Sequence, residues 1–142
     1  MEAKKHKAWK LLRQIPGIGP IRAAVLIALI QTPHRFRTKR QLWTYSGLGL
    51  ETHDSAQYHA VEGQLQRSRK PATVRGLNIF KGAATRVSSR SGPSRDFYEN
   101  LLAKGRKPTM ARLTLARKIA AITLIVWKKE VRFDPNYLKQ QA

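Results

Sequence analysis

Residues 53–59 (HDSAQYH) include the side chains whose types could carry out covalent chemistry. Ser55 is the candidate nucleophile, with His53, Asp54 and His59 beside it. A Ser-His-Asp hydrolase uses these residue types, but triad members usually converge from distant segments, and the sequence has no Gly-x-Ser-x-Gly elbow. Residue types alone therefore favour a solvated serine in an Asx-type turn.

The carboxylates are too scattered to predict a metal site. A magnesium-dependent nuclease needs about two or more carboxylates that converge on one or two ions. Glu51 and Asp54 are close in sequence, but the eight acidic residues form no convincing metal-binding cluster. The four histidines have no ligand spacing, and the absence of cysteine excludes a thiolate nucleophile and Cys-ligated zinc. We therefore expect no metal and no cofactor in this chain.

The strongest local pattern is Leu12-x-x-Ile15-Pro16-Gly17-Ile18-Gly19-Pro20-x-x-Ala23-x-x-Leu26, which is typical of a helix-hairpin-helix. Glycines let the hairpin backbone approach a phosphate closely, because no side chain stands in the way. The next helix then offers free N–H groups and the positive end of its dipole. We expect Pro16, Gly17, Gly19 and Arg22 to contact the DNA backbone. The alternative is an αα-hairpin whose glycines serve only tight packing.

A second cluster of positive charge follows the polar stretch. Arg67, Arg69 and Lys70 lie close together, and Arg75 comes shortly after them. Basic residues spaced like this in a loop suit a track along phosphates, whereas a solvated charge run is the alternative. Taken together with the hairpin pattern, this basic cluster favours contact with nucleic acid.

The charge of the whole chain points the same way. Its 142 residues include 28 Lys and Arg but 8 Asp and Glu, so the net charge is +20. Such an excess repels itself in a compact fold unless a polyanion neutralises it, so duplex DNA is the expected partner, ahead of a membrane surface. The longest apolar run, residues 23–30, is far shorter than the ~20 residues that span a bilayer. We expect a cytoplasmic, nucleoid-associated protein.

Helical patterns dominate the chain, so the predicted fold class is mainly α: a helix-hairpin-helix domain with an irregular polar and basic loop region and two short strands. Thr38 and Ser94 are the expected N-caps of two helices. We expect a basic lead-in helix at 1–10, the hairpin-containing domain at 11–133 and a frayed tail at 134–142. The predicted helices span residues 4–14, 20–31, 38–46, 74–89, 94–104 and 108–129, and the predicted strands span 48–51 and 64–67.

Four segments in this order resemble the C-terminal transposase domain of the IS110/IS116/IS902 insertion-sequence family, over about residues 8–134. The first is Leu11-Leu12-Arg13-x-Ile15-Pro16-Gly17-Ile18-Gly19-Pro20, and the second is Phe36-x5-Leu42-x2-Tyr45-x-Gly47-Leu48. The third runs from Asn78 through Phe80-Lys81-Gly82-Ala83-Ala84, and the fourth is residues 111–120 (ARLTLARKIA). The hairpin alone occurs in many DNA repair proteins, whereas the ordered set is more specific.

The resemblance implies a role in DNA transposition. In the family an N-terminal ribonuclease-H-like domain holds magnesium on acidic residues, and the C-terminal domain supplies a serine for strand cleavage and joining. The active site is shared between protomers, and a guide-type bridge RNA selects the DNA. The resemblance therefore implies an acidic-domain protomer or a homo-oligomer as a further partner, with Mg²⁺ needed by the complete enzyme.

Ser55 matches the family's serine, which lies in the polar stretch after the Tyr-x-Gly-Leu segment. Ala56 departs from the pattern, because glycine often follows that serine, and Ser68 is the reserve candidate. Without the acidic domain, we expect a truncated transposase, a fragment of a decayed element or half of a split gene, inactive by itself. The alternative function is a standalone, non-enzymatic helix-hairpin-helix module that binds DNA or RNA.

Overall fold

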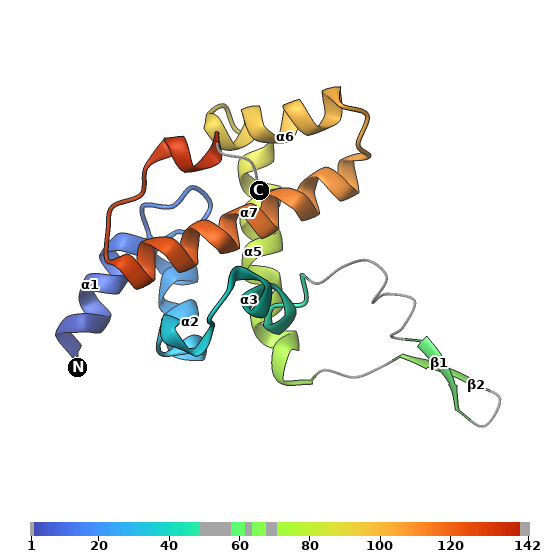
Figure 1. Cartoon of the computed structure of the whole chain (residues 1–142), viewed down its shortest axis with the longest axis horizontal. Helices are drawn as coiled ribbons and strands as arrows, with labels where there is room; N and C mark the ends of the chain where they lie inside the picture. Colours follow the sequence, from blue (N-terminus) through green and yellow to red (C-terminus); the bar gives the residue numbers. More distant parts are fainter. Residues whose placement is uncertain (1, 49–57, 62–63, 68–70, 140–142) are drawn as a thin grey trace.

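The computed structural model describes residues 2–48, 58–61, 64–67 and 71–139, and these residues form a mainly helical domain (Figure 1). The N-terminal part contains helices α1 (Glu2–Leu12), α2 (Pro20–Ile30) and α3 (Lys39–Tyr45), with the short 3-10 helix η1 (Pro33–Arg35) before α3. The strands β1 (Tyr58–Val61) and β2 (Gln64–Arg67) follow. The C-terminal part contains α5 (Pro71–Ser88), α6 (Pro93–Ala103), α7 (Pro108–Lys129) and the 3-10 helix η2 (Pro135–Leu138).

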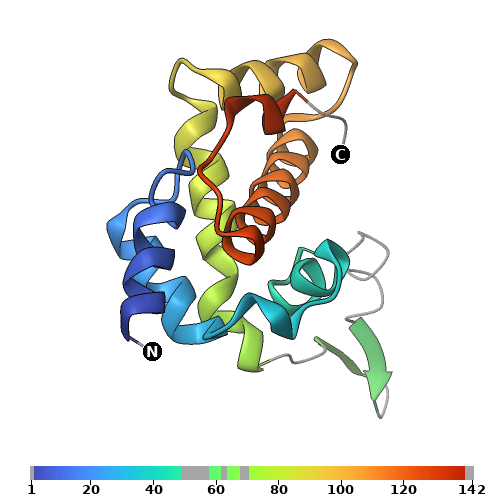
Figure 2. The same ribbon diagram turned by 60° about the vertical axis from the view of Figure 1, so that its left-hand side comes forward.

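Helix α7 is the central element of the fold. It contacts α1, α3, α5, α6 and η1, and it crosses α5 (Figure 1). The two helices lie next to each other in the turned view as well (Figure 2). Pro108 stands in its first turn, where the missing N–H costs no hydrogen bond. The chain leaves α7 through Glu130, which takes a left-handed conformation with φ of 52°. The bounds match the predicted helix at 108–129.

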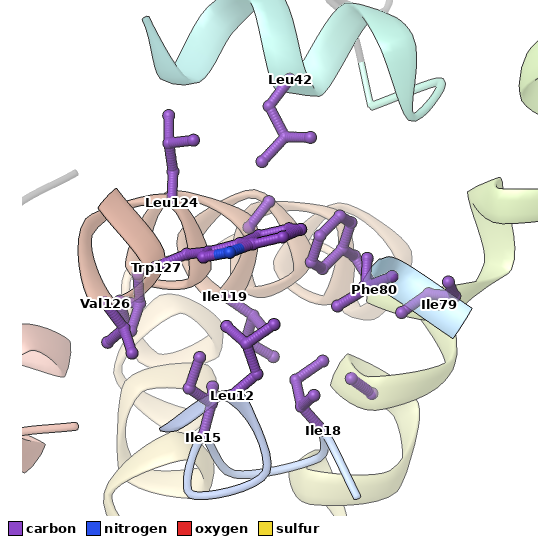
Figure 3. Close-up of a cluster of buried hydrophobic side chains, with 14 of the residues drawn as sticks. Leu12, Ile15, Ile18, Leu42, Ile79, Phe80, Ile119, Leu124, Val126 and Trp127 are labelled. Carbon is purple, nitrogen blue, oxygen red and sulfur yellow. The ribbon is translucent and has the colours of Figure 1, made fainter. Parts of the chain in front are cut away.

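The core forms where the hairpin, α3 and α5 meet α7 (Figure 3). Leu12 and Ile18 come from α1 and the hairpin, and Phe80 comes from α5; each is at most 1% exposed. Leu42 packs on this cluster from α3, and Trp127 closes it from the last turns of α7. Burial of these apolar side chains supplies most of the driving force that holds the helices together.

The two strands pair as an antiparallel hairpin. Tyr58 lies opposite Arg67, and Val61 lies opposite Gln64. The prediction of a strand at 64–67 is therefore confirmed. The other predicted strand, 48–51, falls mostly outside the described residues. The strand β1 was not predicted, because its four residues are few and end in two adjacent apolar residues, Ala60 and Val61, which interrupt the alternation.

Two local predictions were wrong. Ser94 does not cap α6: the N-cap is Gly92, because Pro93, with its φ already fixed, starts the helix one residue earlier. The segment after Asp134 is not frayed as far as it is described. Asp134 accepts a hydrogen bond from the Asn136 N–H at 2.9 Å and caps η2, and Leu138 is 4% exposed within the core.

Thr38, by contrast, is the N-cap of α3, as predicted. Its side-chain oxygen accepts a hydrogen bond from the Gln41 backbone N–H at 3.3 Å. Gly47 follows the C-cap Ser46 with φ of 75°, a conformation that favours glycine just beyond a helix end. No helix in the described part of the chain is both long and apolar enough to cross a membrane.

Candidate nucleic-acid interface

The connection between α1 and α2 is a tight hairpin anchored by apolar side chains. Ile15 and Ile18 are 2% and 1% exposed, and the Ile18 N–H donates to the Ile15 carbonyl at 2.9 Å. On the other side, the Gln14 side-chain oxygen accepts a hydrogen bond from the Phe133 N–H at 3.2 Å. The hairpin is therefore fixed to the helical body and to the segment that follows α7.

Gly17 is a packing glycine. Its φ is +86°, and a Cβ built on it would lie 2.8 Å from both the Cβ and the carbonyl oxygen of Ala83 on α5. Only a residue without a side chain lets the hairpin come this close to the α5 backbone. The predicted contact between Gly17 and a phosphate stays a prediction, but its lack of a side chain is already explained by packing.

Gly19, unlike Gly17, has open space where a side chain would stand. It is the N-cap of α2 with φ of −83°, which other residues also adopt, and nothing lies within 4 Å of a Cβ built there. Pro20 occupies the first helical position, and the N–H groups of Ile21 and Arg22 have no acceptor within the helix. Gly19 therefore places no side chain of its own between this helix end and an approaching phosphate oxygen.

Trp9 holds the positive charge of Arg13 beside this helix end. Its indole N–H donates to the Pro20 carbonyl at 3.0 Å, and the Arg13 guanidinium lies 4.6 Å from the centre of the indole ring. The exposed Arg13 is thus held near the start of α2 through a cation–π contact. No sequence pattern predicts this bond, and Trp9 was expected only as an apolar residue of the first helix.

Arg22 braces the hairpin from within the fold. Its Nη1 donates to the Gly17 carbonyl at 3.4 Å, and its Nη2 lies 3.0 Å from where a Cβ of Gly82 would stand. The half-buried side chain therefore runs between the hairpin and α5. Pro16, the remaining predicted hairpin residue, is also half-buried.

The other predicted site residues belong to other elements or fall outside the described residues. Arg67 ends β2, and Arg75 lies in the first half of α5. Ser55, Arg69 and Lys70 fall outside the described residues, as does the reserve candidate Ser68. The arrangement of Ser55 and the basic cluster therefore stays a prediction.

Arg117 holds the point where the chain enters that region. Its Nε donates to the Leu48 carbonyl at 2.6 Å, and Leu48 itself is fully buried. The sequence suggested only a snorkelling arginine on a core helix at this position. The contact ties the end of the Tyr-x-Gly-Leu segment to α7.

Most charges near these elements are positive. Two ion pairs occur between described residues, Lys7 with Glu130 at 3.2 Å and Arg95 with Glu99 at 2.6 Å. Within the described ranges no three His, Cys, Asp or Glu residues are grouped so that they could hold a metal ion.

A basic helical domain with a glycine hairpin against its core is the class of protein that this geometry defines. The family model described as "Transposase IS116/IS110/IS902 family" matches residues 9–99. The chain belongs to this family of insertion-sequence transposases, and its relationship to transposition follows from that membership.

Two curated relatives extend the match over most of the chain. An uncharacterized 44.8 kDa protein of insertion element IS116 from Streptomyces clavuligerus is 25% identical over 130 residues, which cover 89% of this chain and 31% of that protein. A provisionally named transposase of Sinorhizobium fredii, y4pF/y4sB, is 28% identical over 130 residues, covering 88% of this chain and 32% of the relative. The chain thus spans about a third of the length of the curated relatives that it matches.

Proposed function

We propose that the chain binds duplex DNA for an insertion-sequence transposase and receives a backbone phosphate at the start of α2. The observation that carries the proposal is a contrast between the two hairpin glycines. The space that a side chain at Gly17 would need is occupied by α5, whereas the space at Gly19 is open. Arg13 and the N-terminal dipole of α2 add positive potential at the same place. Such a contact positions DNA without reading its bases.

The net charge of +20 supports the same partner. Each phosphate that a cation neutralises releases counterions, so the logarithm of the binding constant falls with the logarithm of salt concentration by about 0.9 per phosphate. Anisotropy of a fluorescent duplex, titrated at increasing salt, measures this slope. An affinity that does not change with salt contradicts the proposal.

A charge placed at Gly19 tests where the DNA lies. Gly19→Glu sets a carboxylate at the open helix end and is expected to weaken duplex binding by about tenfold or more, which corresponds to a loss of about 1.4 kcal/mol. The matched control is Thr109→Glu, which places the same charge in the exposed first turn of α7. Equal losses in both variants would show that only the total charge matters. Competition with structured RNA separates DNA binding from RNA binding.

The second part of the proposal concerns strand cleavage and joining. We infer that Ser55 is the nucleophile: its Oγ forms a bond to phosphorus, the bond from phosphorus to the departing sugar oxygen breaks, and the proton ends on that oxygen. Such a step needs groups that stabilise the charge on the phosphoryl centre. Four cationic residues follow Ser55 in the sequence and could supply part of this stabilisation: Arg67, Arg69, Lys70 and Arg75. Mg²⁺ held by the remainder of a complete transposase would supply further positive charge.

A chimera tests this inference. In it, the chain replaces the matching third of the Streptomyces clavuligerus relative, and labelled duplex DNA is assayed for an adduct that resists detergent. We expect an adduct with the chimera, none with the 142-residue chain alone, and none with Ser55→Ala, whereas DNA binding stays within about threefold because a hydroxyl adds little to backbone affinity. Ser68→Ala is the control. An adduct that persists in Ser55→Ala and disappears in Ser68→Ala contradicts the assignment.

A further inference from the structure

A pocket of about 270 Å³ lies between the segment that leads into α3 and the C-terminal half of α7. Its floor is aliphatic and comes from one face of α7, where Ala121, Leu124 and Ile125 stand at helical spacing. Ala121 and Ile125 keep part of their surface accessible, whereas Leu124 is 7% exposed. None of the described residues that line the pocket belongs to the hairpin.

Four cations surround this floor. Arg37 precedes α3 and Lys39 is its first residue, and Lys128 and Lys129 come from the last turn of α7. No carboxylate is among the described residues that line the pocket, and the ion pairs between described residues use other cations. The ammonium of Lys39 lies 5.4 Å from the centre of the Trp43 ring, so this charge is held at the rim by the protein itself.

We propose that this pocket binds an acidic amphipathic helix. An aliphatic side chain of that helix enters the pocket and packs on its floor, and carboxylates on either side of it form ion pairs with the four cations. The pocket has room for one or two aliphatic side chains, and its rim complements negative charge on both sides. Helices that lay an apolar face into a groove are a recurrent mode of protein recognition. Charge complementarity across such an interface also selects the partner and its orientation.

Duplex DNA fits this pocket less well. A nucleic acid contributes an apolar group only when a base leaves the stack, and unstacked bases are usually held on aromatic rings. The described residues of this floor are all aliphatic. The cations alone would suit phosphates, but the floor between them favours a protein side chain.

The probe is a stapled helical peptide of about 14 residues in which leucines recur at i, i+3, i+4 and i+7 and glutamates flank them. A peptide of the same composition, with its leucines spread around the helix, is the control for charge alone. Binding of both to the full chain is measured by fluorescence anisotropy. We expect the amphipathic peptide to bind about tenfold more tightly than the control peptide. Equal binding overturns the proposal.

Two chain variants test the two parts of the site. Ala121→Leu fills the floor without a change of charge, and the double variant Lys39→Glu with Lys128→Glu reverses the rim. The matched control is Lys104→Glu with Lys107→Glu, which makes the same change of net charge at exposed positions between α6 and α7. Peptide affinity is expected to fall about tenfold in the first two variants and less than about threefold in the control.

The outcome for DNA keeps this proposal distinct from the proposed function. Ala121→Leu is expected to leave duplex binding unchanged, because the hairpin lies elsewhere. If Ala121→Leu weakens DNA binding and spares the peptide, the pocket belongs to the nucleic-acid interface and the proposal is overturned. Circular dichroism confirms that each variant is folded; if Ala121→Leu unfolds the chain, amide shifts of Leu124 and Ile125 on peptide addition decide the site, and their absence overturns it.

Discussion

Trp43 and Arg117 hold each other in place across the interface of α3 and α7. The indole N–H of Trp43 donates to the Arg117 carbonyl at 2.9 Å, and the Arg117 guanidinium lies 5.8 Å from the centre of the Trp43 ring. The same guanidinium donates to the Leu48 carbonyl at 2.6 Å. Two residues 74 positions apart therefore fix the end of the Tyr-x-Gly-Leu segment, after which Ser55 follows in the sequence.

Trp43→Phe is expected to lower the free energy of unfolding by about 1–2 kcal/mol, because it removes the indole donor and part of the packed ring. Chemical denaturation with urea measures the change. Trp9→Phe is the matched control: its indole bond to Pro20 is exposed, so water replaces the lost partner and the cost is smaller. Equal losses in both variants would contradict a special role for the Trp43–Arg117 contact.

The two hairpin glycines are expected to differ in stability rather than to behave alike. Gly17→Ala should cost about 2–4 kcal/mol, since the new Cβ meets the α5 backbone and the left-handed φ disfavours a side chain. Gly19→Ala should cost less than about 1 kcal/mol, the difference between glycine and alanine at an N-cap. Urea midpoints of the two variants give the comparison. A tolerated Gly17→Ala would mean that the hairpin does not pack on Ala83 as described.

The sequence predicted the helices well because their ends carry local signals. Pro108 marks the first turn of α7, and the pattern around this helix predicted both of its bounds, whereas the start of α6 was placed at Ser94 instead of Pro93. The roles of Gly17 and Gly19 could not be separated in this way, because both lie in the same motif and the difference depends on Ala83, which is distant in sequence. Leu138 was missed for the same reason: a single leucine in a polar terminus gives no periodic signal of burial.

Ser94, which does not cap α6, buries a hydroxyl group inside the fold. The residue lies inside α6 and is 3% exposed, and its hydroxyl oxygen has no hydrogen-bond partner among the described residues. A buried polar atom without a partner costs about 1–3 kcal/mol. Ser94→Ala is therefore expected to leave stability unchanged or raise it by about 1 kcal/mol, as measured by thermal unfolding. A clear loss of stability would show that the hydroxyl does have a partner; Ser91→Ala, at an exposed position, is the control.

Lys118 provides a prediction about pH. The residue is 7% exposed on α7, and burial lowers its pKa below the ordinary value of 10.5, with a further contribution from the nearby charge of Lys39. Between the pKa in the folded chain and 10.5, the unfolded chain binds more protons at this residue. The contribution of Lys118 to the free energy of unfolding therefore rises with pH across that window, and its destabilising effect is fully present below it.

Lys39→Gln isolates the part of this shift that comes from charge. Removing the cation is expected to raise the pKa of Lys118 toward 10.5 without restoring it fully, because burial is the larger cause. A titration of the Lys118 side-chain Cε and Nζ resonances by NMR measures the change. Arg40→Gln is the matched control, since it removes one exposed cation from the same helix but is not among the causes of the shift. An unchanged Lys118 pKa in Lys39→Gln, or an equal rise in Arg40→Gln, would show that the two lysines are not coupled through space at the α3–α7 interface.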